Sequence, residues 1–223
     1  MKKIFLSLAA TLLITSSAYA GQWGVGVAGS FFNIDADVTE TTTAGTVGGG
    51  SANTNKGSVS HDGVLSGALF VQYTMDAYPV TVGFDYTPGS ADISKKMQSR
   101  TETPTSGDNA SSSTDFKANA EIENLMTAYV EIPVYNNVYL KGGYTQVDVN
   151  TNESGMNSYG NASSEEGITY GIGMSSGNDS GLGYKIAYEV IDFDTIEVKS
   201  SSSNKVSGDI DTAGVKVSVV YNF

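Results

Sequence analysis

From Gly21 onward, apolar and polar residues alternate with a period of two over successive short stretches. This alternation is typical of β-strands that have one apolar face. The pattern predicts eight strands, at about 22–38, 63–73, 80–87, 120–132, 138–144, 167–175, 182–190 and 214–223. In the first strand the adjacent pair Phe31 and Phe32 moves the apolar positions to the other parity, where we expect a β-bulge.

The connections between these strands are alternately short and long. The short ones, 74–79, 133–137 and 176–181, contain the Pro, Gly, Asn and Asp residues of tight turns. The long ones, about 39–62, 88–119, 150–166 and 199–208, are polar and bury too little apolar surface to offset their ordering entropy. Outer-membrane barrels alternate in this way, with short periplasmic turns and long outer loops. The sequence therefore predicts an all-β, eight-stranded antiparallel up-and-down transmembrane β-barrel with both ends on the periplasmic side.

The first twenty residues have a different character. Lys2 and Lys3 precede an apolar run from Ile4 to Ile14, and the segment ends in Ala18-Tyr19-Ala20. This is the pattern of a secretory signal peptide, and the apolar run is shorter than the roughly 20 residues of a membrane-spanning helix. We expect cleavage after Ala20, which leaves residues 21–223 as a single barrel domain in the bacterial outer membrane.

Composition narrows the function classes. The chain has no cysteine, so disulfides do not stabilise the exported protein. Its net charge of −12 argues against a nucleic-acid partner, because phosphate binding needs clustered Lys and Arg. The 26 glycines and 13 tyrosines favour an all-β chain over a helical one.

The two faces of the predicted strands differ in charge. One face carries Val, Ile, Leu, Tyr and Phe and is expected to face lipid. An eight-stranded barrel is wide enough only for side chains, and buried charges there must be paired. We therefore predict a structural charge network in the lumen, in which Lys141 could meet Glu131, and Lys185 and Lys216 could meet Glu189 and Asp85. The predicted members are Asp85, Glu121, Glu123, Glu131, Lys141, Lys185, Glu189 and Lys216. A soluble barrel would expose this polar face instead, and the pattern leaves that alternative open.

Aromatic residues gather near the strand ends that precede or follow the short turns, as in the aromatic girdles of membrane barrels. Tyr86 and Tyr144 would lie nearer the outer interface. The residues expected at the periplasmic interface are Trp23, Tyr73, Tyr78, Tyr184, Tyr221 and Phe223.

The last strand alternates from Val215 to Phe223 and closes on Val220-Tyr221-Asn222-Phe223. With the signal peptide and the barrel pattern, it makes the chain resemble small outer-membrane barrels of the OmpA, OmpX and opacity-protein type. The resemblance implies that Phe223 is the signal read by the barrel assembly machinery. It also implies contact with outer-membrane lipid and lipopolysaccharide, and we expect a monomer. We expect no peptidoglycan-binding domain of the OmpA type after the barrel.

Catalytic chemistry is not indicated. The single histidine, His61, lies in Ser60-His61-Asp62, and Gly63 stands where the His-x-Ser arrangement of lipid A deacylases would place serine. Carboxylates in Asp35-Ala36-Asp37, in Asp192-Phe193-Asp194 with Glu197, and in Asp209-Ile210-Asp211 resemble calcium ligands. A solvated barrel rim explains them better, and we predict no catalytic residue, metal or cofactor.

Four functions remain open. The favoured one is a structural and surface-interaction role, in which the barrel anchors exposed polar loops for adhesion, phage contact or envelope integrity. The glycine-rich face of residues 167–175 suggests a narrow porin-like channel as the alternative. A lipid-modifying enzyme and a soluble secreted β-protein are less favoured.

Overall fold

The computed structural model describes residues 21–42, 53–76, 80–93, 98–102, 114–154, 164–177, 181–199 and 205–223. The expected signal peptide, residues 1–20, lies outside them. The strands are β1 Gly21–Thr42, β2 Asn53–Met75, β3 Thr81–Asp92, β4 Gln98–Glu102, β5 Thr114–Tyr135, β6 Val138–Ser154, β7 Glu165–Gly177, β8 Gly181–Phe193, β9 Ile196–Lys199 and β10 Lys205–Asn222. None of the described residues belongs to a helix long and apolar enough to cross a membrane.

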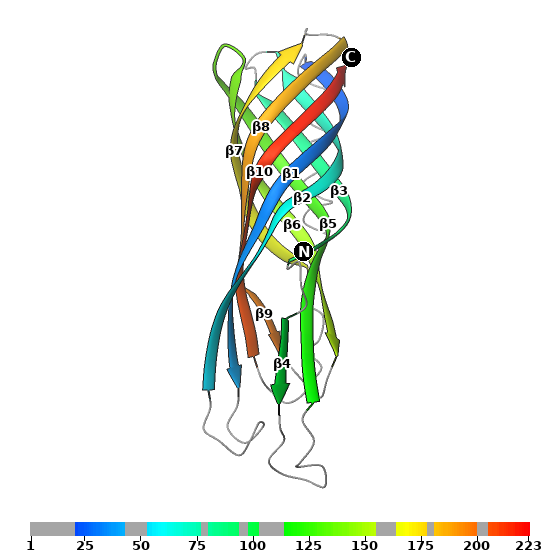
Figure 1. Ribbon diagram of the computed structural model, residues 1–223. Helices are drawn as coiled ribbons and strands as arrows, with labels where there is room; N and C mark the ends of the chain where they lie inside the picture. The colour runs from blue at the N-terminus through cyan, green and yellow to red at the C-terminus, as the bar shows by residue number, and fades with distance from the viewer. Residues whose placement is uncertain are drawn as a thin grey trace.

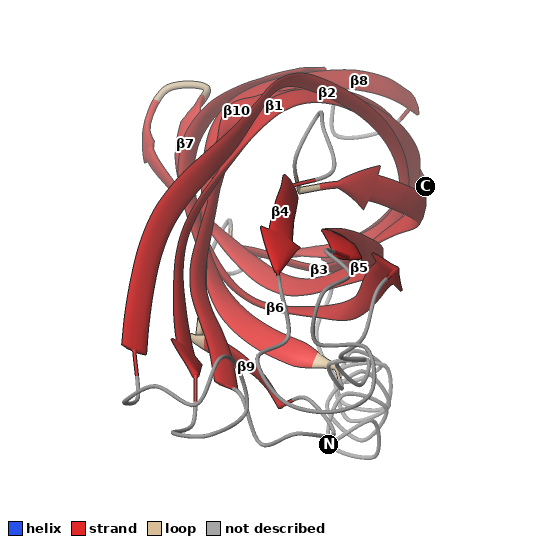
Figure 2. Cartoon of the chain, turned by 60° about the horizontal axis from the view of Figure 1, so that its bottom comes forward, coloured by secondary structure: helices blue, strands red, loops and turns tan. Residues whose placement is uncertain are grey.

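The sheet closes into a ring. Its order is β1-β2-β3-β5-β6-β7-β8-β10, and β10 pairs back to β1 along Gly24 to Thr41. The two remaining strands add to single neighbours, β4 to β5 and β9 to β10. Every pairing is antiparallel, and Figures 1 and 2 show the resulting ring from the side and from one end. The predicted all-β, eight-stranded up-and-down barrel is confirmed.

Both chain ends of the described barrel lie together. Trp23 and Phe223 exchange backbone hydrogen bonds of 3.2 and 2.8 Å, which fix β10 beside β1. The connections β2–β3, β5–β6 and β7–β8 lie at this same end, which we call the turn end; it is uppermost in Figure 1. The opposite end, where β4 and β9 lie, is called the loop end.

The strands continue well past their predicted limits at the loop end. Residues 39–41 of β1 and residues 54–62 of β2 belong to continuous pairing, although the sequence placed them in a long loop. The predicted long connections are shortened in the same way by β5, β6 and β10. These extensions were missed because their exposed positions are Asp, Ser, Thr and Lys, which also occur in loops. At about 3.3 Å per residue the 22 residues of β1 span roughly 70 Å, about twice what a bilayer-spanning strand needs.

The ring divides into two facing sheets at the loop end. Pairing between β2 and β3 ends at Leu69 and Tyr86, and pairing between β6 and β7 ends at Val147 and Glu165. Beyond these points β2, β1, β10 and β9 form one group and β3, β4, β5 and β6 the other, as the lower part of Figure 1 shows. A buried apolar cluster, called the loop-end core, contains residues from both groups. Its members are Ile34, Ala36, Val64, Ile93, Ile122, Val147, Val149, Phe193, Ile196 and Ile210.

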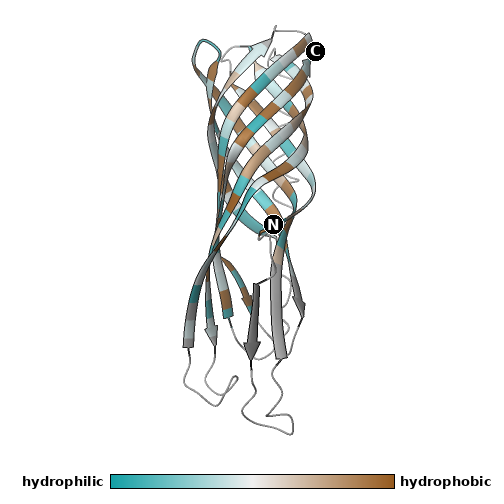
Figure 3. Ribbon diagram, in the orientation of Figure 1, coloured by the Kyte–Doolittle hydropathy of each residue, from teal (hydrophilic) through white to brown (hydrophobic). Residues whose placement is uncertain are grey.

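The turn-end half has the opposite arrangement, with its large apolar side chains on the outside. Leu65 is 79% exposed, and further exposed apolar residues lie on β1, β5, β6, β7, β8 and β10. In β3 the outward residues Val82, Phe84 and Tyr86 are partly exposed. Together these residues are called the belt. Its main members are Val25, Val27, Phe31, Leu69, Val130, Ile132, Leu140, Ile168, Tyr170, Ile172, Met174, Leu182, Tyr184, Ile186, Tyr188, Val215, Val217 and Tyr221. Figure 3 shows the alternation of apolar and polar residues along these strands.

The apolar face thus changes sides within single strands. In β1, Val27 and Phe31 point outward, whereas Ile34 and Ala36 are buried. The pairing of β1 with β10 is continuous through this point, so β1 keeps its parity and contains no bulge. The bulge predicted at Phe31-Phe32 is instead in β2, where Gly63 has φ +77° and donates to Asn33 Oδ1 at 3.0 Å. Along β1 the apolar residues change from the outer side of the barrel wall to its inner side.

In β5 the backbone itself changes parity. Asn124 has φ +54° at an irregularity in the pairing with β6. Its side chain accepts from Tyr86 Oη at 3.1 Å and donates to Asp148 Oδ2 at 3.4 Å, which holds the bulge between β3 and β6. As a result Thr127 and Ile122 both point inward although they are five positions apart.

Candidate functional site

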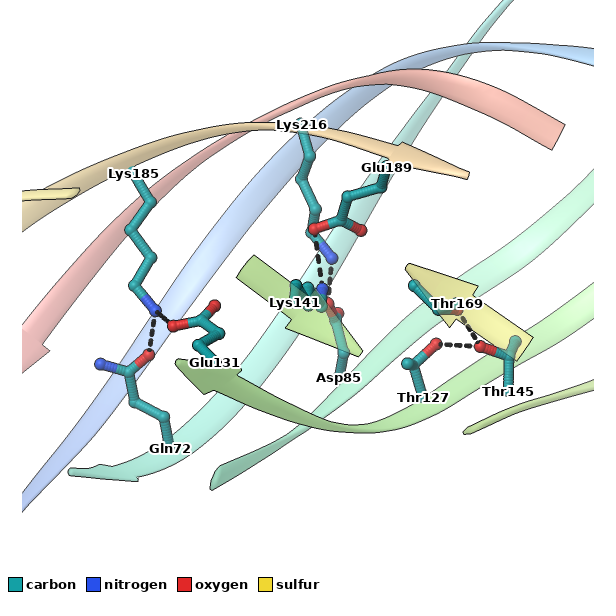
Figure 4. Close-up of polar contacts among 10 residues, drawn as sticks. All are labelled: Gln72, Asp85, Thr127, Glu131, Lys141, Thr145, Thr169, Lys185, Glu189 and Lys216. Atoms are coloured by element: carbon teal, nitrogen blue, oxygen red, sulfur yellow. Dashed lines mark hydrogen bonds and ion pairs between the residues drawn. The ribbon is translucent and has the colours of Figure 1, made fainter. Parts of the chain in front are cut away.

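Three ion pairs cross the lumen of the turn-end half (Figure 4). Lys141 Nζ lies 2.7 Å from Glu189 Oε1, and Lys185 Nζ lies 2.6 Å from Glu131 Oε2. The third pair joins Lys216 to Asp85 Oδ2. The structure therefore brings together Asp85, Glu131, Lys141, Lys185, Glu189 and Lys216, all at most 15% exposed in their side chains.

Each ion pair joins two strands that are not neighbours in the ring. The expected pair of Lys216 with Asp85 is present and joins β10 to β3. Glu131 and Lys141 are neighbours in the β5–β6 register, but each pairs with a residue of β8 instead. Side chains on the concave inner face of a barrel converge toward its axis, so Lys141 and Lys185 reach carboxylates across the lumen.

Glu121 and Glu123 lie outside this network, which corrects their predicted membership. Ile122, between them, is buried in the loop-end core, so its two neighbours point away from the interior. The sequence placed Ile122 and Met126 on one face, and the bulge at Asn124 separates them. No signal for that bulge is present in the apolar alternation.

Aromatic rings fill the space between the charges. Lys141 Nζ is 4.4 Å from the ring centroid of Tyr129, and Lys185 Nζ is 5.5 Å from that of Tyr139. These are cation–π distances. A Cβ at Gly83 would overlap the ring of Tyr129, and one at Gly173 would overlap the ring of Tyr139, so both rings need glycine opposite them. The glycine-rich face that suggested a channel instead makes room for side chains that occupy the lumen.

A row of threonine hydroxyls continues the polar interior on the far side of the ion pairs. Thr127 and Thr145 are bonded at 2.9 Å, and Thr145 is bonded to Thr169. The row joins β5, β6 and β7, as Figure 4 shows. Gln72 also belongs to the interior, because Lys185 Nζ donates to its Oε1 at 2.6 Å. Sequence reasoning missed Gln72, Tyr129, Tyr139 and the threonines, although all of them occupy the face it had assigned to the lumen.

The aromatic residues predicted for one interface lie at the turn end. Trp23 and Tyr73 are register partners with ring centroids 5.1 Å apart. Tyr221 and Phe223 are stacked at 6.5 Å, and Tyr184 is exposed near the start of β8. Tyr78 lies outside the described residues.

The outer surface of the loop end carries aspartates directly opposite one another. Asp35 pairs with Asp211, Asp37 with Asp209, and Asp211 with Asp192 across three strands. Partial burial, followed by the charge of Asp192, raises the pKa of Asp211. No group of three or more acidic or histidine side chains among the described residues is arranged to hold a metal ion.

His61 bridges the two sheets where they separate. Its Nδ1 lies 2.6 Å from the backbone oxygen of Asp92, which joins β2 to β3 beyond their last register pair. The histidine that the sequence left as a solvated loop residue is therefore a strand residue with a structural contact.

Comparisons with known proteins give likeness of shape alone. No protein-family model and no curated protein matches the chain. Among solved structures, it is similar to the outer membrane protein OprG from Pseudomonas aeruginosa, at 14% identity and TM-score 0.44, over 92% of this chain and 97% of that one. It is similar to the outer membrane protease OmpT from Escherichia coli, at 7% identity and TM-score 0.41, over 91% and 97%. It is also similar to Neisserial surface protein A, at 13% identity and TM-score 0.37, over 86% and 97%. Likeness at this level identifies no function, and the resemblance to OmpA-type, OmpX-type and opacity-type barrels stays a prediction.

Proposed function

We propose that the chain is a bacterial outer-membrane protein with a structural and surface-interaction role. In this proposal the turn-end half spans the membrane, and the loop-end half projects from it and carries the connecting loops toward partners outside the cell. Adhesion, phage contact and envelope integrity are the roles that fit such an arrangement.

The observation that carries the proposal is the exposed apolar belt. Soluble monomers rarely expose contiguous apolar patches larger than a few hundred Å². Here large aliphatic and aromatic side chains are exposed on β1, β2, β5, β6, β7, β8 and β10 of the turn-end half, and those of β3 are partly exposed, while its interior holds the charges. A lipid bilayer is the solvent that suits this inversion, and the closed ring leaves no unpaired edge in it. The aromatic residues at the turn end suit the membrane interface on that side.

The loop end supports the surface-interaction part of the proposal. Beyond the belt, β1 and β2 continue with a polar, acidic exterior and with their apolar residues inside. This arrangement suits water, so the projecting sheets would present the loops at a distance from the membrane surface. The narrow channel is less favoured because three ion pairs and two tyrosine rings occupy the lumen.

Fractionation with an electrophoretic heat shift tests the membrane part. The protein should sediment with the outer membrane and should migrate differently before and after boiling, because the folded barrel resists detergent. A short epitope inserted after Gly49 should bind antibody on intact cells, whereas one fused after Phe223 should bind only after the membrane is permeabilised. Recovery in the soluble fraction, or the reverse labelling, would refute the proposal.

Export and assembly supply a second set of measurements. The mature chain should begin at Gly21 by intact mass, as cleavage after Ala20 requires. Deleting Phe223 should reduce the folded, heat-shifted fraction if this residue is the signal for the barrel assembly machinery. Planar-bilayer recordings of the folded protein should show no conductance steps above baseline; regular steps would favour the channel instead.

A further inference from the structure

The loop-end part of β2 has a neighbouring strand on one side only. Residues 56–61 pair with β1, whereas the pairing of β2 with β3 begins only at Leu69. In Figure 1 this part of β2 runs along the left margin of the lower half, apart from β4 and β5. Every second residue of such a strand directs its backbone N–H and C=O away from β1, where another strand can pair with them. We call residues 56–62 the β2 edge.

One side chain of the β2 edge contacts β3. His61 Nδ1 lies 2.6 Å from the backbone oxygen of Asp92. His61 is the register partner of Ile34, which is fully buried, so this contact lies on the inner side of the wall. The outer side of the edge remains exposed to solvent at Lys56, Ser58, Ser60 and Asp62.

The exposed residues of the β2 edge are self-complementary. They occupy every second position and therefore share one face. When the edge is placed antiparallel to a second copy of itself with Val59 opposite Val59, Lys56 of each copy lies opposite Asp62 of the other. Ser58 lies opposite Ser60 in the same way. Opposite charges and hydroxyl groups directly across from one another stabilise antiparallel strands.

The register centred on Val59 is the one that suits both sides of the sheet. The two nearest registers that keep the outward residues together place Lys56 opposite Ser60 or Val64, so neither charge meets its counter-charge. On the inner side, Gly57 of one copy would lie opposite His61 of the other. A Cβ at Gly57 would meet no atom within 4 Å, so the space beside it accepts an imidazole ring.

From these observations we propose that the β2 edge binds the β2 edge of a second copy of this chain. The two strands pair antiparallel about Val59, and two ion pairs between Lys56 and Asp62 form on the outer side. The contact is isologous, because the same patch serves both copies. The inference rests on the proposed function and names the partner for its surface-interaction role.

Strand direction decides where the second copy lies. In one membrane all copies have their turn ends on the same side, so their β2 strands point the same way. A two-fold rotation about the membrane normal would bring the edges together only with the polar outer face of one sheet beside the apolar inner face of the other. Antiparallel pairing matches the faces and needs a copy of reversed orientation, which a facing membrane supplies. The contact therefore joins two facing outer membranes, where many short contacts act together.

Vesicle clustering tests the contact with the intact protein. Phosphatidylcholine vesicles that carry the protein should cluster, as measured by light scattering, and protein-free vesicles should not. Lys56→Asp places like charges opposite each other at both ends of the pairing and should slow clustering about tenfold. Asp62→Lys should slow it equally, although it lowers the net negative charge and with it the general repulsion between vesicles. The double variant Lys56→Asp with Asp62→Lys restores both ion pairs in reverse and should recover the clustering rate.

Lys199→Asp is the matched control. Lys199 is exposed on β9 at the same end of the barrel, and this substitution changes the net charge as much as Lys56→Asp does. Its clustering rate should equal that of the unmodified protein, and every variant should keep the heat-shifted electrophoretic band.

Three outcomes would overturn the inference. One is equal slowing by Lys199→Asp, and another is no recovery in the double variant. The third is the absence of clustering by unmodified protein that is folded and inserted, which would leave the proposed function intact. Failure of the protein to insert into vesicles would overturn the proposed function together with the inference.

Discussion

The two halves of this barrel use the same strands in opposite ways. In the turn-end half, apolar side chains face outward and charges face inward; in the loop-end half, apolar side chains face inward and aspartates face outward. The change occurs within β1 between Phe31 and Ile34, without any break in its pairing to β10. One strand can therefore carry its apolar residues on the outside at one height of the barrel and on the inside at another, depending on what surrounds the wall there.

The interiors of the two halves also differ in what holds them together. Ion pairs, cation–π contacts and hydroxyl rows fix the turn-end lumen, and each depends on a specific partner. The loop-end core relies on packing between two sheets, which tolerates substitutions that keep volume and apolarity. The stability of the two halves should therefore respond to different mutations.

The largest expected difference is in the free energy of unfolding that is lost when a buried or an exposed ion pair is broken. Lys141→Met leaves Glu189 buried without its partner and should lower the unfolding free energy by about 3–5 kcal/mol. Replacing both residues, as Lys141→Met with Glu189→Leu, should restore most of that loss. At the loop end, Lys205 and Glu197 are 41% and 48% exposed, and Lys205→Met should cost about 1 kcal/mol or less. Denaturant titration in lipid vesicles measures all three, and equal losses at the two ends would contradict the comparison.

The next difference concerns two apolar residues of the same strand. Ile34 is 0% exposed in the loop-end core, so Ile34→Ala should cost about 2–5 kcal/mol by opening a cavity. Val27 is outward in the belt, and Val27→Ala should cost less than about 1 kcal/mol if, as proposed, lipid fills the space. Hydrogen exchange of the loop-end amides is the measurement. Faster exchange there in Val27→Ala than in Ile34→Ala would reverse the assignment of the two faces.

Charge on the outer surface gives a third contrast. Ile172→Lys places a cation in the belt and should cost about 2–4 kcal/mol if lipid surrounds it near the bilayer midplane. Ser60→Lys places the same charge on the exposed loop-end exterior, where the change should be within about 0.5 kcal/mol. Denaturant titrations of both variants in lipid vesicles measure these changes. Equal stability of Ile172→Lys and Ser60→Lys would contradict the contrast.

The smallest expected effect lies among the loop-end aspartates. Asp211→Asn removes the middle one of three like charges that lie opposite one another on β1, β10 and β8, which should stabilise the folded protein by about 0.2–1 kcal/mol at neutral pH. The raised pKa of Asp211 means that the folded state binds its proton more readily than the unfolded chain does. Stability from this group therefore rises as the pH falls toward its ordinary pKa of 3.8 and declines as the pH rises.

Hydrogen exchange of the β1 and β10 amides between pH 4 and pH 7 measures this pH dependence of stability. The unmodified protein should lose more protection on raising the pH than Asp211→Asn does, after correction for intrinsic exchange rates. Identical pH dependence in the two proteins would mean that the opposed aspartates do not repel one another in solution.

The sequence was sufficient to predict the barrel because the belt strands alternate strictly and tight turns separate them at one end. It also indicated the six lumen charges, since they share a face with glycine and threonine. It failed where the apolar side of the wall changes: the shift to Ile34 and Ala36 was interpreted as a β-bulge in the first strand, and Val59 was assigned to a loop because its outward neighbours are polar. The bulge at Asn124 was invisible for another reason, because it depends on contacts with Tyr86 and Asp148 from other strands.

The central claim is that the environment of β1 changes from lipid to water between Phe31 and Asn33. The chain has no cysteine, so single cysteines at positions 25, 27, 29, 31, 33, 35 and 37 are unique reporters on its outward face. Their reactivity toward a membrane-impermeant maleimide, measured in intact outer membranes, is the most direct test. We predict protection up to position 31 and fast labelling from position 33 onward. Fast labelling at position 27, or protection that continues to position 37, would contradict the account.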